Sequence, residues 1–517
     1  MPGKNSTAVI VRGHSLTLEE VVKVARYHHP VELGEESCRK VERTRKYVER
    51  LLLEKKVVYG LTTGFGKFSD TYISPDDTQQ LQLNLIRSHS CGIGAPLPEE
   101  TVRAILLLRI NALSLGYSGI RLEVISLMAA MLNRGVVPVI PEKGSLGASG
   151  DLAPLSHMAL VLIGEGEADY QGIRLPGAEA LVQAGLAPIV LEAKEGLALI
   201  NGTQVMTAVG VLACWDAMRL ADWADCTAAL TCEALLAVRD AFDPAAHAVR
   251  PHKGQQQSAG NIRHMTAGST LMTNQGERRV QDAYSLRCAP QVHGASRDAL
   301  AYIAGRLTTE MNSATDNPLI FADDERVISG GNFHGQPVAL PMDHLAVCAA
   351  ELASIAERRI ERLVNPQLNE GLPPFLTENG GLQSGFMIAQ YTAAALVSEN
   401  KSHAHPASVD SIPSSGNQED HVSMGTIAAR KARQIVDNAY GVLAVELLCA
   451  AQAAEFRGPQ QLGRGTKWLY DRCRELAAPL TEDRVLSGDF AAVAEWMKQP
   501  GVLDRLFARV TFGSCAE

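Results

Sequence analysis

Hydrophobic and polar positions alternate in short stretches up to about residue 203, and each stretch ends at turn-forming residues. The apolar run 8–11 predicts a strand. Thr17 and Glu20 then form a capping-box pattern ahead of VVKVARY, which predicts the start of a helix. The glycine-rich stretch 59–66 predicts a loop. Further helices are predicted over about 39–56, 99–115 and 121–134, and around HMALVLIG.

From residue 204 onward, the pattern changes to long stretches rich in alanine and leucine. The helices predicted there cover about 204–240, 296–313, 338–365, 383–401 and 420–456. Several exceed the mean helix length of about 11–12 residues, which indicates a bundle of long helices. We therefore expect a mainly α protein with a smaller mixed N-terminal part over 1–203 and a long-helix bundle over 204–517. The chain has no evident repeat or low-complexity linker, so both parts should belong to one compact unit.

Composition supports a folded, helical protein. Of 517 residues, 46% are hydrophobic, 20% charged and only 5% aromatic, a balance that excludes general disorder and favours helices over a β-sandwich. The formal charge of −9 leaves no basic surface typical of nucleic-acid or anionic-membrane binding.

The ten cysteines include no Cys-x-x-Cys pair, and several lie in apolar, helix-like sequence. This pattern is typical of free thiols in a reducing compartment. The N-terminus lacks the long apolar segment of a signal peptide. The uncharged runs 196–215 and 379–398 are interrupted by polar residues, so neither is expected to span a membrane. We expect a cytoplasmic protein.

The segment GSLGASGD, residues 144–151, is the first candidate for chemistry. It is compatible with a flexible glycine loop or a weak phosphate cradle, but it lacks the P-loop lysine, and Asp151 breaks a G-x-S-x-G pattern. A different chemistry is also open to it. The unhindered nitrogen of Gly150 could attack the Ala148 carbonyl and close a five-membered ring. Dehydration of Ser149 would then leave a conjugated alkene, an electrophile that no ordinary side chain provides.

The longer segment GSLGASGDLAPLSHMAL resembles the signature of the histidine, phenylalanine and tyrosine ammonia-lyases. The other blocks that match this family in order are YGLTTGFG, NGT, QDAYSLR, TDNP, GGNF and NQEDH, which together span residues 59–421. The resemblance implies that Ala148, Ser149 and Gly150 become a methylidene-imidazolone (MIO) group without an external cofactor. It also implies loss of ammonia and a β-proton from an α-amino acid, in a mainly helical homotetramer whose active sites draw residues from three subunits.

The resemblance assigns roles to residues far apart in the chain. Tyr59 is the implied base, for which its site must favour phenolate or couple the phenol to a proton relay. Tyr284 is expected to assist proton transfer near the MIO group, and Arg287 to hold the substrate carboxylate through a bidentate ion pair. Without the family, Tyr59 would be a packing anchor, Tyr284 a core residue and Arg287 a surface residue.

Four more residues are implied to contact the substrate. Asn201 and Gln281 are expected to form hydrogen bonds around the carboxylate and the ring. Phe333 and Met387 are expected to form the pocket wall, with simple core packing as the alternative.

Two positions bear on the choice of substrate. A buried imidazole needs hydrogen-bond partners at both nitrogens, whereas a phenyl ring needs none. His89, within Ser-His, and Glu419, within NQEDH, resemble the histidine branch and could bind the two imidazole nitrogens. Alternatively, Glu419 and Asp420 only favour a helix N-terminus. Thr62 departs from the histidine branch, which more commonly has asparagine there, and leaves relaxed selectivity open.

The predicted activity is thus elimination of ammonia from L-histidine to give trans-urocanate. Phenylalanine or tyrosine lyase or aminomutase activity is the alternative within the family, and an inactive helical assembly or binding protein is the alternative from another class. The residues His403, His405, Asp410 and His421 match no metal-site spacing, and Pro406 interrupts any helix there, so no metal is expected.

Overall fold

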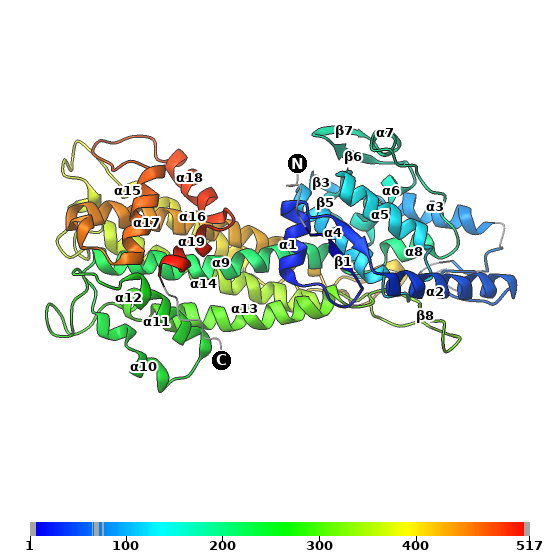
Figure 1. Cartoon of the computed structure of the whole chain (residues 1–517), viewed down its shortest axis with the longest axis horizontal. Coiled ribbons are helices and arrows are strands. Elements are labelled where there is room, and N and C mark those ends of the chain that lie inside the picture. Colours follow the sequence, from blue (N-terminus) through cyan, green and yellow to red (C-terminus); the bar gives the residue numbers. More distant parts are fainter. Residues whose placement is uncertain (1–6, 65, 67–71, 75–76, 511–517) are drawn as a thin grey trace. The chain divides into compact units, whose positions relative to one another are not determined.

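The predicted helical character is confirmed by a computed structural model of the chain, which describes residues 7–64, 66, 72–74 and 77–510 (Figure 1). Two compact units are present. Unit 1 comprises Met1–Leu212, Ala304–Asp343 and Pro406–Arg430. Unit 2 comprises Ala213–Ile303, His344–His405 and Lys431–Glu517. Each unit is therefore assembled from stretches that are distant in sequence.

Short strands connect the helices of unit 1. A parallel pair is formed by β1 (Val9–Val11) and β2 (Val31–Leu33). The antiparallel pairings are β3 (Ile93–Pro96) with β5 (Pro141–Lys143), β4 (Val137–Pro138) with β6 (Glu167–Tyr170), β6 with β7 (Ile173–Pro176), and β8 (Leu319–Phe321) with β9 (Arg326–Ile328). Strands β1 to β7 lie within residues 1–203, where a mixed part is predicted, whereas β8 and β9 lie outside that range.

The shorter helices of unit 1 surround the predicted loops. They are α1 (Leu18–Tyr27), α2 (Glu35–Leu53), α3 (Thr78–His89), α4 (Glu99–Leu113), α5 (Leu122–Arg134), α6 (Leu152–Leu162), α7 (Gly177–Gln183) and α8 (Glu195–Ile200). The capping box is confirmed, because the Thr17 side chain accepts from the Glu20 amide and the Glu20 side chain accepts from the Thr17 amide. Helices α3, α6 and α8 pack against one another. This packing brings the ends of α3 and α8 near the start of α6.

Five long helices match the alanine- and leucine-rich stretches. They are α9 (Gln204–Ala234), α13 (Ala289–Met311), α14 (Gln336–Val364), α15 (Met387–His403) and α16 (Gly425–Arg457). Helix α9 ends before the predicted residue 240 because Leu236 adopts a left-handed conformation with φ +54°. Helix α13 begins before the predicted residue 296 because Pro290 falls in its first turn, where a missing backbone N–H costs nothing.

Unit 2 contains the remaining helices. They are α10 (Pro244–Ala248), α11 (Lys253–Met265), α12 (Tyr284–Arg287), α17 (Arg464–Leu476), α18 (Ser487–Lys498) and α19 (Val502–Arg509). Four short 3₁₀ turns lie among the described residues: η3 (Arg239–Phe242), η4 (Pro374–Leu376), η5 (Ser415–Asn417) and η6 (Pro459–Gln461).

Buried ion pairs join the long helices within unit 2. On α9, Asp225 accepts from His293 at 2.7 Å and from Arg297, both on α13. On α14, Arg359 donates to Glu446 of α16. Burial alone would raise the pKa of Asp225, but Arg297 and His293 outweigh it and lower that pKa below its ordinary value. Each buried charge is therefore compensated.

By length and composition alone, α14 and α16 could each cross a membrane. Their apolar windows are 67% and 83% buried within the structure, however, as is typical of core helices.

Candidate active site

Unit 1 contains a cavity of about 1130 Å³ lined by residues from several segments of the chain. Six of the predicted site residues line it: Tyr59, His89, Ser149, Asn201, Phe333 and Glu419. Ala148 and Gly150 line an adjacent smaller cavity, which shares His89, Ser149 and Glu419 with the first. The fold thus brings together residues separated by up to 360 positions, from Tyr59 to Glu419.

The Ala148-Ser149-Gly150 segment lies directly ahead of α6, where its backbone meets a second glycine. Gly150 has φ +75° and forms a parallel bridge with Gly202. A Cβ atom on Gly150 would lie only 2.1 Å from the Gly202 carbonyl oxygen, and one on Gly202 would lie 2.4 Å from a guanidinium nitrogen of Arg109. Only glycine fits at both positions. The backbones of Gly150 and Gly202 therefore meet at a point that leaves no room for a side chain on either residue.

Asp151 anchors the segment from its other side. Its buried carboxylate accepts from the Val205 and Met206 amides, both at 2.9 Å, at the N-terminus of α9, and from the Ser145 hydroxyl at 2.8 Å. Burial raises the pKa of Asp151, whereas hydrogen bonds from Thr426 and these groups lower it. The Asp151 oxygens are therefore fully engaged in holding the segment.

Glu419 contacts the serine of the segment. The Ser149 hydroxyl donates to Oε1 of Glu419 at 3.0 Å, and the Ser414 hydroxyl donates to Oε2 at 3.2 Å. Ser414 and Glu419 also pair through their backbones as an antiparallel bridge. Helix α16 begins only at Gly425, so stabilisation of its N-terminus does not account for the position of Glu419.

Tyr59 lies half-buried in the loop that follows α2. Its hydroxyl accepts a hydrogen bond from the Gly66 amide at 3.2 Å. Burial raises the pKa of Tyr59, and the nearby charge of Glu419 raises it further, while the Gly66 amide opposes both effects. The neutral phenol is therefore favoured in this chain by itself.

Thr62, which stands where the histidine branch more commonly has asparagine, forms hydrogen bonds within the same loop. It is buried, its hydroxyl donates to the Lys56 carbonyl at 3.0 Å, and it accepts from the Val58 amide at 2.9 Å. Thr62 does not line the cavity. The Thr62 hydroxyl holds the start of the loop. Because Thr62 is not part of the cavity lining, it has no direct contact through which to choose the substrate.

His89 is the last residue of α3 and is half-buried. Its Nδ1 lies 3.0 Å from the Ser88 hydroxyl. Burial lowers the pKa of His89, although the Leu85 carbonyl and the charge of Glu419 oppose this. Its imidazole is therefore neutral at pH 7 and presents one donor and one acceptor.

Asn201 follows α8 and is almost fully buried. Its amide group donates to Asp316 at 3.3 Å and to the Asn317 carbonyl at 3.0 Å. The buried Lys194 ammonium in turn donates to Asp316 at 2.9 Å. Because both partners of the Asn201 amide are acceptors, its NH₂ group must face them. Its carbonyl oxygen is buried without a hydrogen-bond partner among the described residues.

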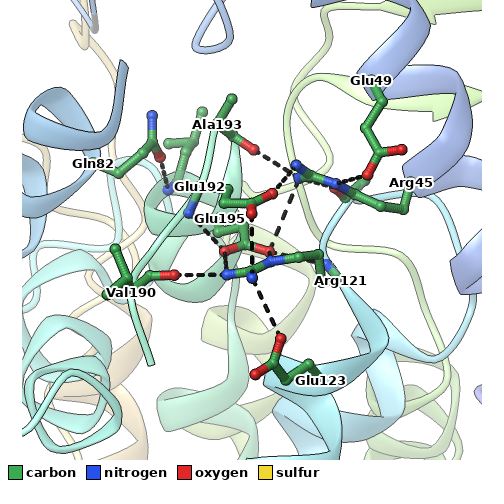
Figure 2. Close-up of polar contacts among 11 residues, drawn as sticks. Arg45, Glu49, Gln82, Arg121, Glu123, Val190, Glu192, Ala193 and Glu195 are labelled. Carbon is green, nitrogen blue, oxygen red and sulfur yellow. Dashed lines mark hydrogen bonds and ion pairs between the residues drawn. The ribbon is translucent and has the colours of Figure 1, made fainter. Parts of the chain in front are cut away.

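An ion-pair cluster holds the start of α8, the helix that leads to Asn201 (Figure 2). Glu195, which is completely buried, accepts from the Arg121 guanidinium at 2.7 Å through each of its oxygens. Arg45 of α2 donates to Glu192 and to the Ala193 carbonyl. Figure 2 shows Glu195 between the two arginines. This cluster ties α8 to α2 and to the start of α5.

The remaining predicted site residues belong to unit 2 and do not line the cavity. They are Gln281, Tyr284, Arg287 and Met387. Tyr284 is 71% exposed, so it is not a core residue. Arg287 stacks over its ring at 4.8 Å, and the Nε atom of Arg287 is buried without a partner among the described residues.

Several polar residues of the site were not predicted from the sequence. Asp316 accepts a hydrogen bond from Asn201 and another from Lys194. Ser414 donates a hydrogen bond to Glu419. Asp316 lies within the TDNP block, which marks it as a candidate. Ser414 and Lys194 have no comparable local signal. Among the described residues, no group of three or more histidine, cysteine, aspartate or glutamate side chains is arranged to hold a metal ion.

Comparison with known proteins gives this arrangement its context. The family model described as aromatic amino acid lyase matches residues 16–475. The chain belongs to the aromatic amino acid lyase family. It is 60% identical to a histidine ammonia-lyase of Alkaliphilus metalliredigens over 498 residues, which cover 96% of this chain and 98% of that protein.

Solved structures of the same family show the same fold. A histidine ammonia-lyase from Trypanosoma cruzi superposes with a TM-score of 0.91 at 44% identity, covering 98% of this chain and 96% of that one. A tyrosine aminomutase from Streptomyces globisporus reaches 0.94 at 40% identity, covering 98% and 99%. Fold alone therefore does not separate the substrates, and the side chains of the cavity must do so.

Proposed function

We propose that this protein is a histidine ammonia-lyase that converts L-histidine into trans-urocanate and ammonia. The observation that carries the proposal is the placement of His89 and Glu419 on one cavity with Ser149. A neutral histidine and a carboxylate offer the two partners that a buried imidazole requires and a phenyl ring does not. The high identity to histidine ammonia-lyases supports this choice.

We propose that Ala148, Ser149 and Gly150 form an MIO group. The close approach of Gly150 to Gly202 and the anchoring of Asp151 fit this group, since they bring the backbone into a tight turn that no larger residue would allow. The group, once formed, supplies an electrophile that improves the substrate amine as a leaving group. No external cofactor is proposed.

The chain's own residues then orient the substrate and move its protons. His89 and Glu419 hold the imidazole, and Phe333 forms part of the wall. Asn201, fixed by Asp316, contributes a hydrogen bond at the amino acid end. Tyr59 removes the β-proton, which requires that its raised pKa be offset when the substrate binds.

We propose that a homotetramer completes each site in the cytoplasm. Gln281, Tyr284, Arg287 and Met387 would reach the cavity from other copies of the chain, with Arg287 holding the carboxylate and Tyr284 assisting proton transfer. The 71% exposure of Tyr284 supports this, because its side chain is accessible to another copy of the chain.

The deciding experiment offers purified protein L-histidine, L-phenylalanine and L-tyrosine separately and follows the ultraviolet absorbance of each unsaturated product. Urocanate should form readily. Cinnamate or coumarate without urocanate would indicate a phenylalanine or tyrosine lyase instead, and β-amino acids would indicate an aminomutase. The Ser149→Ala variant should be folded and inactive, and full turnover by that variant would contradict the proposed chemistry.

A further inference from the structure

The hydrogen bond from Ser149 to Glu419 has no place in the lyase reaction. The proposed MIO group no longer contains the Ser149 hydroxyl, so this contact exists only in the unprocessed chain. Within the described residues, Glu419 is the acid that contacts this hydroxyl, at 3.0 Å. The other nearby carboxylate, Asp151, is occupied by two backbone amides and the Ser145 and Thr426 hydroxyls. Glu419 is therefore the carboxylate positioned to act on the Ser149 hydroxyl before the enzyme's first turnover.

We propose that Glu419 is the acid–base group that dehydrates Ser149 when the chain processes itself. This inference rests on the proposed function, since it concerns how the MIO group forms. It adds a second, earlier task for a residue whose other proposed task is to bind the substrate imidazole.

The chemistry balances without an oxidant or a co-reactant. The Gly150 nitrogen bonds to the Ala148 carbonyl carbon, and the carbonyl oxygen leaves as water with the Gly150 and Ser149 amide protons. The Glu419 carboxylate then takes the proton from Cα of Ser149, and the released electron pair forms the Cα–Cβ double bond. The Cβ–Oγ bond breaks, and Glu419 returns the proton to the departing oxygen, which leaves as a second water.

The surroundings of Glu419 suit this exchange. Ser414 donates to Oε2 and so holds the carboxylate in place, while Oε1 remains directed at the Ser149 hydroxyl. The backbone pairing of Ser414 with Glu419 stiffens this turn. A carboxylate fixed at one oxygen can accept and return a proton without the side chain having to reorient.

The test measures the intact mass of the newly made protein before any substrate is added. In wild type, intact-mass spectrometry should show a deficit of two water molecules relative to the encoded chain. Glu419→Gln keeps the side-chain shape and can still accept the Ser149 hydrogen bond, but it cannot carry the proton. It should retain the Ser149 hydroxyl, with a deficit of at most one water, or should lose the second water about a hundredfold more slowly in a time course of cell-free synthesis.

Two variants serve as controls. Glu419→Asp keeps a carboxyl group and should recover part of the processing rate, which also shows whether a fault in folding explains the glutamine variant. His89→Gln changes a neighbouring cavity residue that does not contact the Ser149 hydroxyl, so it should show the full two-water deficit although its turnover of histidine falls.

A full two-water deficit in Glu419→Gln, reached at the wild-type rate, would overturn this inference and leave the proposed lyase function intact. No deficit in the wild-type protein would instead overturn the proposed self-processing itself. The two failures are therefore distinguishable by mass alone.

Discussion

Tyr59 shows how a side chain suited to a task can lack the electrostatic support that the task needs. A general base works best when its pKa lies near the working pH. Burial and Glu419 raise the pKa of Tyr59 instead, and the Gly66 amide opposes this rise. A positive charge near the phenol, such as the Arg287 that we propose another copy supplies, would act in the required direction.

The rate should therefore rise with pH. Below the raised pKa of Tyr59, the phenolate fraction grows about tenfold per pH unit, so kcat/KM for histidine should increase from neutral pH into the alkaline range. Tyr59→Phe should lower kcat by about 10²–10⁴-fold and remove this alkaline rise. Tyr72→Phe is the matched control, because Tyr72 is 52% exposed and outside the cavity lining, and it should keep the wild-type profile. An unchanged profile in Tyr59→Phe would exclude Tyr59 as the base.

Five of the six predicted residues that line the cavity lie in the family blocks, and His89 was predicted from its Ser-His pair. The hydrogen-bond partners of Asn201 were not predicted. Asp316 accepts a hydrogen bond from the Asn201 amide and is itself held by Lys194, but it lies 115 positions from Asn201 along the chain. The TDNP block marks Asp316 as a candidate, but a local pattern does not show which distant side chain it contacts.

At the scale of elements, α8 is short and depends on the charges around it. It is preceded by its N-cap residue Lys194, which has φ +73°, an unfavourable backbone conformation for a residue with a Cβ atom. The ion pairs of Arg45 and Arg121 and the buried Glu195 offset that cost and hold the helix that leads to Asn201 (Figure 2).

Removing the Glu195 carboxylate, at the centre of this cluster, should lower the stability of the protein substantially. Glu195→Ala leaves Arg121 without its buried partner and should lower the free energy of unfolding by about 3–5 kcal/mol. Glu123, in the same cluster, is 65% exposed, so Glu123→Ala should cost at most about 1 kcal/mol. Chemical denaturation of the assembled protein measures both changes. Equal losses in the two variants would show that burial of Glu195 is not what matters.

Long helices were predicted well because their apolar content is visible in sequence, and capping at Thr17 was predicted from two residues. Helix ends were less predictable. The left-handed conformation of Leu236 ends α9 inside an apolar run that continues the helical pattern, and only tertiary packing determines such a turn.

For the whole molecule, the division of the predicted site is the main result. The cavity in unit 1 is lined by Ser149, His89 and Glu419, whereas Arg287, the predicted carboxylate anchor, belongs to unit 2. The two-part division near residue 203 and the tetramer stay predictions.

Mixing two inactive variants tests the shared site. Ser149→Ala and Tyr284→Phe should each have little activity alone. If Ser149 and Tyr284 of one site come from different copies, co-expression in equal amounts should restore about a quarter of the wild-type rate, because each of the two positions is intact with a chance of about one half. Separately purified variants, mixed without exchange of subunits, provide the baseline. No recovery in the co-expressed sample would place both residues in the same copy.

The bond between Ser149 and Glu419 also bears on when the protein acquires its affinity. Under the proposed binding of the substrate imidazole by Glu419, the serine hydroxyl competes with the substrate for this carboxylate in the newly made chain. Dehydration removes that competitor in the same step that completes the electrophile. Histidine is then bound only by molecules that are ready to transform it.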